Sequence, residues 1–109
     1  MLEISHFEIL FVLVHIISWK KISDFVTKHP NSGPSLKSWF RVVQNTDFKD
    51  FDELRKVFKS ADQVGKFTVF NISGNNFRLI SAIHYNRKKV FIRYVLTHSE
   101  YDRGKWKEE

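Results

Sequence analysis

The sequence predicts an α+β domain with N-terminal helices packed on one face of a small antiparallel sheet. Three segments with the period of amphipathic helices occupy roughly the first 60 residues, and three segments rich in β-branched and aromatic residues follow between residues 67 and 96. At 109 residues, of which 42% are hydrophobic, the chain is long enough for one domain with its own core.

The first predicted helix follows Ser18, a candidate N-cap, and ends before Pro30. The segment 31–34, Asn-Ser-Gly-Pro, is typical of a loop. The second helix covers about residues 35–45, where apolar side chains recur at helical offsets. Each of these helices is therefore expected to pack one apolar stripe against the sheet.

The third helix is expected to begin after Asp50, because Asp50 and Glu53 have the spacing of an acidic variant of the capping box. The aromatic side chains of all three helices are expected to belong to the core rather than to ligand platforms. In particular, we expect Trp19 and Trp39 to be buried against the apolar face of the sheet, while the Lys and Arg side chains of the helices face water.

Three strands are predicted at residues 67–72, 77–85 and 90–96, each bounded by residues typical of turns. The first two are joined by a Gly-Asn pair at 74–75, which is typical of a two-residue hairpin turn. The second turn, around residues 86–89, has two or four residues, and both lengths place the same apolar side chains on one face. This predicted core face comprises Phe77, Leu79, Ile83, Val90, Ile92, Tyr94 and Leu96.

Asn71, Arg78 and Arg93 then lie on the opposite face of the sheet, with Asn71 paired with Arg78 across the hairpin. The two arginines would lie close together on an uncovered side. Two neighbouring cations cost energy unless an anion or a carboxylate lies between them. Two interpretations stay open at this point: a solvated sheet face with an acidic partner, or a site that binds phosphate.

The charge balance favours a polyanionic partner. Lys and Arg number 18 against 12 acidic residues, which gives a formal charge of +6, and nucleic acid is the commonest polyanion in the cytosol. There are no cysteines. Disulfides and thiolate metal sites are therefore excluded, and a reducing, cytoplasmic location is expected.

The apolar run from Ile9 to Val14 is too short to cross a bilayer, and no basic residue precedes it as in a signal peptide. We therefore expect no membrane partner. The simplest role of this run is an extra strand, or an apolar tail that lies on the domain.

A dense group of titratable residues follows the last strand. His98 can exchange a proton near neutral pH, Tyr101 can donate a hydrogen bond or a proton, and Asp102 can orient a neighbour or act as a base. A polar C-terminal cap is the alternative interpretation of each residue taken singly. The histidines lack the spacing of metal ligands, and the sequence has no phosphate-binding loop, dinucleotide fingerprint or nucleophile elbow. No metal and no cofactor are expected.

Two long segments resemble the HigB toxins of bacterial toxin–antitoxin pairs. The first runs from residue 69 to 80 and includes the predicted hairpin; the second runs from residue 90 to 102 and includes the titratable group. The likeness covers about residues 14–103 in order. Shorter similarities are the segments His15-Ile16-Ile17-Ser18, Lys28-His29-Pro30, Trp39-Phe40 and Ser60-Ala61-Asp62.

The resemblance implies a compact RelE-like fold and an endoribonuclease that cuts mRNA during translation, at the ribosome. It also implies a cognate antitoxin with a helix-turn-helix domain, similar to HigA. The toxin domain would comprise residues 14–109. Residues 1–13, an apolar extension, depart from the family pattern, and translation from an alternative start codon at Val14 would place them outside the natural product.

RNA cleavage without a metal requires a deprotonated 2′-hydroxyl, a stabilised phosphate and a protonated leaving 5′-oxygen. We assign the phosphate to Arg78 and Arg93. Acid–base catalysis is assigned to His98 and Tyr101, whose roles are interchangeable at this point, with Asp102 orienting one of them. The residues expected to bind RNA are Lys66, Asn71, Asn75 and Arg87. The alternatives are a non-catalytic basic module that binds RNA or a protein, and an inactive toxin relic.

Overall fold

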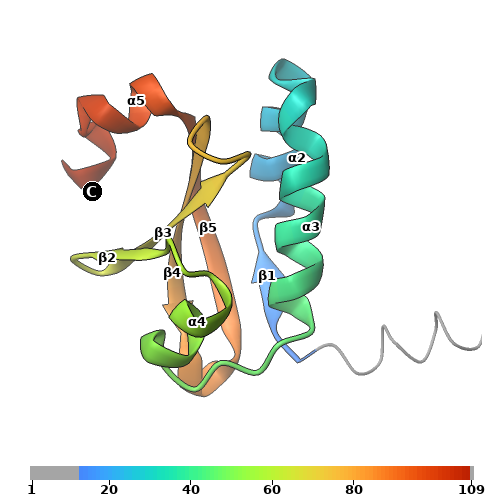
Figure 1. Cartoon of the computed structure of the whole chain (residues 1–109), viewed down its shortest axis with the longest axis vertical. Helices are drawn as coiled ribbons and strands as arrows, with labels where there is room; N and C mark the ends of the chain where they lie inside the picture. The colour runs from blue at the N-terminus through green and yellow to red at the C-terminus, as the bar shows by residue number, and fades with distance from the viewer. Residues whose placement is uncertain (1–12, 109) are drawn as a thin grey trace, which may run out of the picture.

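The computed structural model of the chain describes residues 13–108, and it has the expected α+β architecture (Figure 1). The five-stranded sheet has the order β1-β5-β4-β3-β2, with β1 parallel to β5 and the other neighbours antiparallel. The strands are β1 (His15–Ile17), β2 (Asp62–Val64), β3 (Phe67–Ile72), β4 (Phe77–His84) and β5 (Lys89–Thr97). The α-helices in this part of the chain are α2 (Trp19–Lys28), α3 (Gly33–Gln44), α4 (Phe51–Val57) and α5 (His98–Arg103), and the 3-10 helices are η1 (Pro30–Ser32), η2 (Tyr85–Arg87) and η3 (Lys105–Glu108).

The three long strands lie within a residue of their predicted bounds. The register of the β3–β4 hairpin is confirmed, because Asn71 pairs with Arg78. The turn after β4 has four residues, one of the two predicted lengths, since His84 pairs with Lys89. The edge strands β1 and β2 were not predicted, and the parallel pairing of β1 makes the sheet mixed rather than purely antiparallel.

The ends of α2 and α3 differ from the prediction in their local chemistry. Ser18 precedes α2, but its backbone is left-handed (φ 79°) and its side chain makes no cap hydrogen bond. Pro30 follows the end of α2 as expected. The predicted loop at 31–34 is wrong: η1 covers its first part, and Gly33 and Pro34 already belong to α3. Proline is tolerated in a first helical turn, where its missing N–H would have had no partner.

The start of α4 confirms the acidic cap. A carboxylate oxygen of Asp50 accepts a hydrogen bond from the Glu53 N–H at 2.9 Å. The Glu53 side chain in turn accepts from the Lys49 N–H at 2.9 Å, one residue before the expected position. The cap places Leu54 inward, where it is almost fully buried.

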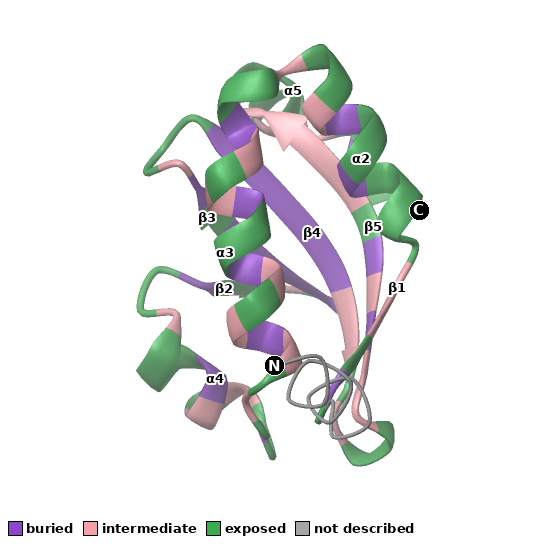
Figure 2. Cartoon of the chain, turned by 90° about the vertical axis from the view of Figure 1, so that its right-hand side faces the viewer, coloured by how far each residue is buried: buried purple, intermediate pink, exposed green. Residues whose placement is uncertain are grey.

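The main core lies between α2, α3 and α4 and one face of the sheet, and β4 is buried along most of its length (Figure 2). Trp39 belongs to this core and is only 3% exposed, as predicted. The prediction for Trp19 is wrong, because that side chain is 47% exposed. Trp19 lies in the first turn of α2 and meets α3 instead of the sheet, with its ring 4.7 Å from Phe40 in an edge-on arrangement.

A bulge in β5 overturns part of the predicted core face. Ile80 pairs with Tyr94, whereas the next residue, Ser81, pairs with Ile92, so that Arg93 is the extra residue on β5. An extra residue inverts the alternation of side chains beyond it. Tyr94 and Leu96 therefore pack on the opposite face from Ile92.

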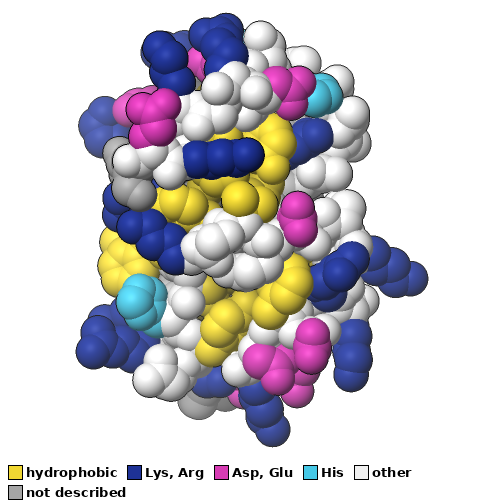
Figure 3. Space-filling model, turned by 90° about the vertical axis from the view of Figure 1, so that its left-hand side faces the viewer, with side chains coloured by type: hydrophobic (Ala, Val, Ile, Leu, Met, Phe, Trp, Pro, Cys, Tyr) yellow, Lys and Arg dark blue, Asp and Glu magenta, His cyan; other side chains and the backbone are white. Residues whose placement is uncertain are grey.

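This opposite face is also covered, contrary to the prediction of an open polar surface. A second group of buried side chains forms there, and the partly buried rings of Tyr94 and Tyr101 pack against it. We call this group the C-terminal cluster; its buried members are Phe67, Val69, Ile80 and Trp106. Figure 3 shows the side of the molecule that bears β2 and α5, where patches of apolar surface lie among basic side chains.

The predicted N-terminal extension, residues 1–13, lies outside the described residues except for Leu13. Of the apolar run from Ile9 to Val14, the structure describes only its end. Val14 is buried in the main core, and its N–H donates to the Gln44 carbonyl at 3.2 Å. In the range 13–108, no helix combines the length and apolar character that a membrane span requires.

Candidate active site

Helix α5 holds the predicted titratable residues, and a complete capping box fixes its start. The Thr97 hydroxyl accepts from the Glu100 N–H at 3.2 Å, and the Glu100 carboxylate accepts from the Thr97 N–H at 2.9 Å. The His98 N–H then donates to the Asn76 carbonyl in the β3–β4 turn at 3.0 Å. The capped helix is thereby tied to the β3–β4 turn, close to where β4 begins.

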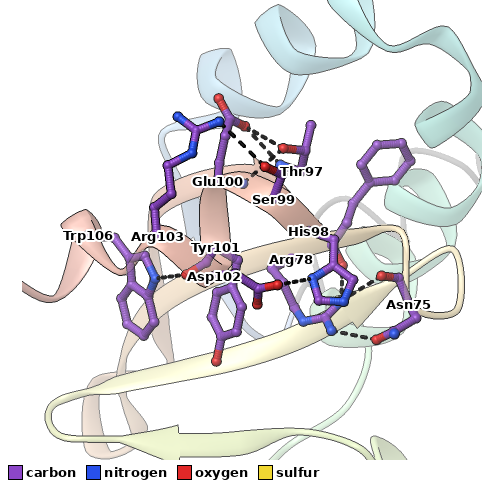
Figure 4. A network of polar contacts seen from close by, with 11 residues as sticks. Asn75, Arg78, Thr97, His98, Ser99, Glu100, Tyr101, Asp102, Arg103 and Trp106 are labelled. Carbon is purple, nitrogen blue, oxygen red and sulfur yellow. Dashed lines mark hydrogen bonds and ion pairs between the residues drawn. The ribbon is translucent and has the colours of Figure 1, made fainter.

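Arg78 lies at this end of the sheet and is only 7% exposed. Its guanidinium donates to the carbonyl oxygens of Asn75 and Phe77 at 3.1 and 3.0 Å, and also to the Asn75 side-chain oxygen (Figure 4). The guanidinium carbon lies 5.2 Å from the centre of the Tyr101 ring, a cation–π arrangement. These contacts hold a buried positive charge in one orientation.

His98 and Asp102 are one helical turn apart, with 3.1 Å between His98 Nδ1 and a carboxylate oxygen, a contact that is an ion pair only when the imidazole is protonated (Figure 4). Nδ1 is shielded from solvent and has no hydrogen-bond partner among the described residues. The His98 side chain as a whole is 43% exposed and that of Asp102 is 63% exposed. The carboxylate therefore lies beside the shielded nitrogen, while much of the imidazole stays accessible.

Tyr101 lies between these polar groups and the C-terminal cluster. Burial raises the pKa of its hydroxyl above 10.0, the nearby carboxylates of Asp62 and Asp102 raise it further, and Arg78 partly offsets them. The hydroxyl therefore keeps its proton at neutral pH and is suited to donate it or a hydrogen bond. We refer to Asn75, Arg78, His98, Tyr101 and Asp102 together as the α5 site.

Arg93 has a different setting from the one that the sequence predicts. It is an exposed residue in the irregular part of β5, and it lines an open hollow with Lys21, Asp24 and Glu100. The expectation that Arg78 and Arg93 would stand together on a bare sheet face is not met, because the bulge changes the course of β5 and Arg78 is buried beside Tyr101.

The predicted RNA-binding residues are spread over the surface. Asn75 contributes its side chain to holding Arg78, and Asn71 is an exposed residue paired with Arg78 across the hairpin. Lys66 is exposed, with its ammonium group 5.3 Å from the centre of the Phe67 ring. Arg87 lies in η2, at the opposite end of β4 from Arg78. Of these four residues, Asn75 belongs to the α5 site and Asn71 is the cross-strand neighbour of Arg78 in that site.

Trp106 in η3 is a neighbour of the site that sequence reasoning missed. Its indole N–H donates to the Tyr101 carbonyl at 3.0 Å, and its ring stacks on the Tyr101 ring. The sequence held one signal for it, a single large apolar residue in an otherwise charged C-terminal tail. Throughout the range 13–108, His, Cys, Asp and Glu side chains do not gather in groups of three or more that would suit a metal ion.

Comparison with known proteins places this sequence in a family. The family model for HigB toxins, described as the RelE-like toxic component of a toxin–antitoxin system, matches residues 32–104. An mRNA interferase HigB from Escherichia coli O6:H1 is 34% identical over 93 residues, which cover 83% of this chain and 90% of that protein. An mRNA interferase toxin HigB from Escherichia coli strain K12 is 33% identical over 92 residues, which cover 82% of this chain and 88% of that protein. The chain therefore belongs to the HigB family of RelE-like toxins of toxin–antitoxin systems.

Proposed function

We propose that the protein is the toxin of a toxin–antitoxin pair and that it acts as an endoribonuclease on mRNA. The observation that carries this proposal is the convergence of Arg78, His98, Tyr101 and Asp102 at one end of the sheet. The names of its relatives, mRNA interferases, support the same substrate. RNA cleavage without a metal needs a cation, a base and a proton donor in one place, and the α5 site offers all three.

In the proposed reaction, His98 acts as the base. Its Nδ1 faces Asp102 and is shielded, so Nε2 is the nitrogen left to take the proton of the substrate 2′-hydroxyl. The 2′-oxygen attacks the adjacent phosphorus, and the bond from phosphorus to the 5′-oxygen breaks. The upstream fragment would end in a 2′,3′-cyclic phosphate, and the downstream fragment would begin with a 5′-hydroxyl.

Arg78 is proposed to stabilise the negative charge that grows on the crowded phosphate. Three of its hydrogen bonds are to the protein, but a guanidinium has five N–H donors, so donors remain for a phosphate oxygen. Tyr101, whose pKa is raised by burial, is proposed to donate its proton or a hydrogen bond to the leaving 5′-oxygen. Loss of one such charge-stabilising donor costs about 100-fold or more in rate.

Arg93 is proposed to bind the RNA strand from the hollow beside α2, as a second phosphate contact at some distance from Arg78. Lys66, Asn71 and Arg87 are proposed as further contacts with RNA, all of them exposed. Contacts spread in this way suit a long polyanion, because each neutralised phosphate adds to affinity in a salt-dependent manner.

The ribosome is proposed to align the substrate. The catalytic groups lie on a short helix at the surface, and His98 and Asp102 are about half exposed, so the protein alone offers little to hold an RNA strand in one conformation. A translating ribosome supplies an extended mRNA, which fits a toxin that acts in the cytoplasm. The cognate antitoxin, proposed to be a HigA-like helix-turn-helix protein, would neutralise the toxin by binding it.

One observation favours a second candidate, a non-catalytic basic module that binds RNA. Arg78 already makes three hydrogen bonds to Asn75 and Phe77, as a purely structural arginine would. The two functions differ in the fate of the RNA, because a binding module leaves its substrate intact. An inactive toxin relic would also leave the RNA intact.

The test is incubation of the purified protein with ribosomes that translate a defined mRNA, followed by analysis of the RNA ends. We expect cuts only in the translated mRNA, with 5′-hydroxyl and cyclic-phosphate ends, and none in the same mRNA without ribosomes. Intact mRNA on translating ribosomes to which the protein binds would favour the non-catalytic module and overturn the proposal.

A further inference from the structure

We infer that Trp106 is a positioning residue for Tyr101. The 3-10 helix η3, which carries Trp106, would thereby support the acid–base site. This inference rests on the proposed function, because it assigns Trp106 a part in the same reaction. Trp106 lies beyond residues 32–104, the range that the family model matches. The inference therefore comes from the contacts of this chain.

Two independent contacts fix Trp106 to Tyr101. The two rings are stacked, with 5.1 Å between their centres and only 14° between their planes. The Trp106 indole N–H also donates to the Tyr101 carbonyl at 3.0 Å. A ring contact and a backbone hydrogen bond together hold both the side chain and the main chain of Tyr101.

Trp106 is itself anchored, which allows it to hold a neighbour. Its side chain is 4% exposed and belongs to the C-terminal cluster. Its ring lies 6.1 Å from that of Phe67, at the start of β3, in an edge-on arrangement. The position of Trp106 is therefore set by the sheet and not by the tail alone.

The Tyr101 ring lies between Trp106 and Arg78 (Figure 4). Arg78 is 5.2 Å from the ring centre, at a face of the ring, and Trp106 stacks on the ring at 5.1 Å. A ring held between a cation and an indole has little freedom to rotate. Because misplacement of a reacting group by about 1 Å can cost on the order of 100-fold in rate, this restraint bears directly on catalysis.

The same contact also bears on how far the Tyr101 ring is exposed to solvent. Trp106 covers part of the tyrosine ring, and burial is the main reason why the pKa of Tyr101 is raised. Replacing the indole by a smaller, non-aromatic side chain would let water reach the tyrosine. The pKa of Tyr101 would then fall toward its ordinary value, and this change can be measured without any substrate.

Two variants separate stacking from simple filling of space. Trp106→Phe keeps an aromatic ring but removes the indole N–H, and Trp106→Leu keeps a smaller apolar side chain but removes the ring. Trp19→Leu is the matched control, because Trp19 is exposed at the start of α2 and packs on Phe40 rather than on α5. None of the three variants replaces a proposed catalytic residue.

Each variant is assayed for cleavage of ribosome-bound mRNA and for the titration of Tyr101, taken as the difference between the protein with and without Tyr101→Phe. We expect Trp106→Leu to lower kcat on the order of 100-fold with KM unchanged and to lower the pKa of Tyr101. Trp106→Phe should restore most of the rate, and Trp19→Leu should match the wild type.

A Trp106→Leu protein with wild-type kcat and wild-type titration of Tyr101 would overturn the inference, since Trp106 would then only fill the core. Failure of the proposed function looks different. In that case the wild-type protein cleaves no mRNA, which also removes the catalytic part of the inference. The titration would still decide whether Trp106 positions Tyr101.

Discussion

The two faces of the sheet are packed in different ways, and the site lies on the smaller of the two packed groups. The main core joins three helices to the sheet and includes fully buried side chains such as Leu36, Leu54 and Leu79. The C-terminal cluster has four buried members, and a six-residue helix and a 3-10 helix cover it. The larger core thus lies on one face of the sheet and the candidate site on the other.

The difference teaches how a small toxin can keep reactive groups exposed without a deep pocket. In the main core, packing is apolar, and the loss of a buried side chain is expected to lower stability without moving a reactive group. In the C-terminal cluster, two contacts involve groups of the candidate site: the Trp106 ring stacks on Tyr101, and the Tyr101 ring faces the Arg78 guanidinium. Substitutions on the two faces should therefore separate loss of stability from loss of activity.

The largest effect on stability is expected from Leu54→Ala in α4. Leu54 is almost fully buried, and α4 and α5 lie at opposite ends of the molecule (Figure 1). Truncation of a buried leucine costs about 2–5 kcal/mol in the free energy of unfolding. Denaturant unfolding measures this loss, and the cleavage rate per folded molecule should not change. A folded Leu54→Ala protein with a reduced rate would contradict the separation of the two faces.

The next effect is expected from Arg78→Ala, which should lower the cleavage rate by about 100-fold because the growing phosphate charge loses a donor. Arg55→Ala is the matched control, since Arg55 is an exposed residue of α4 and has no proposed contact with RNA. Rates are compared on ribosome-bound mRNA after thermal unfolding has shown that both variants fold. Equal rates for the two variants would show that Arg78 is a structural residue.

A smaller effect is expected from Thr97→Ala, which removes the cap of α5. Loss of an N-cap hydroxyl costs about 1 kcal/mol, and here the loss falls on the helix that carries His98, Tyr101 and Asp102. Hydrogen exchange in α5 should accelerate while the main core stays protected. Thr97→Ser keeps the hydroxyl and should behave as the wild type; if both variants exchange alike, the capping box does not hold α5.

The smallest effect concerns pH. The hydrogen bond from the Thr97 backbone N–H is the main cause that lowers the pKa of Glu100 below 4.5. A hydrogen bond with the Thr97 hydroxyl and the positive charge of Arg103 lower this pKa further. Because the folded-state pKa is the lower one, ionised Glu100 stabilises the protein above its unfolded pKa, and this contribution is lost as pH falls through the folded pKa. The stability difference between the wild type and Glu100→Gln should be positive at neutral pH and shrink in acid. A difference that does not vary with pH would exclude this role of the charge.

Sequence patterns predicted the long elements well because their signals are local and strong. The Gly-Asn pair at 74–75 with its flanking strands defined the β3–β4 register, and Asp50 with Glu53 marked the start of α4. The start of α5 was also encoded, since Thr97 and Glu100 have the spacing of a capping box. The helix start was missed because the strand-like pattern of β5 continues up to Thr97, the N-cap residue of α5.

The errors arose where tertiary contacts decide the structure. The run around Arg93 alternates well enough for a continuous strand, so nothing local indicates the bulge that turns Tyr94 and Leu96 to the other face. Strands as short as β1 and β2, with three residues each, carry too little pattern to detect. For the candidate site, the sequence predicted the residue types, whereas the separate settings of Arg78 and Arg93 and the contact with Trp106 depend on packing between distant segments.

The most direct test of the central claim is the mapping of mRNA 5′ ends by primer extension after brief induction of the protein in growing bacteria. The wild type should arrest growth and produce new 5′ ends within translated regions, and His98→Ala should produce neither. The His98 side chain is partly exposed, so the variant should remain folded. New 5′ ends of equal abundance with folded His98→Ala would contradict the proposed chemistry of the α5 site.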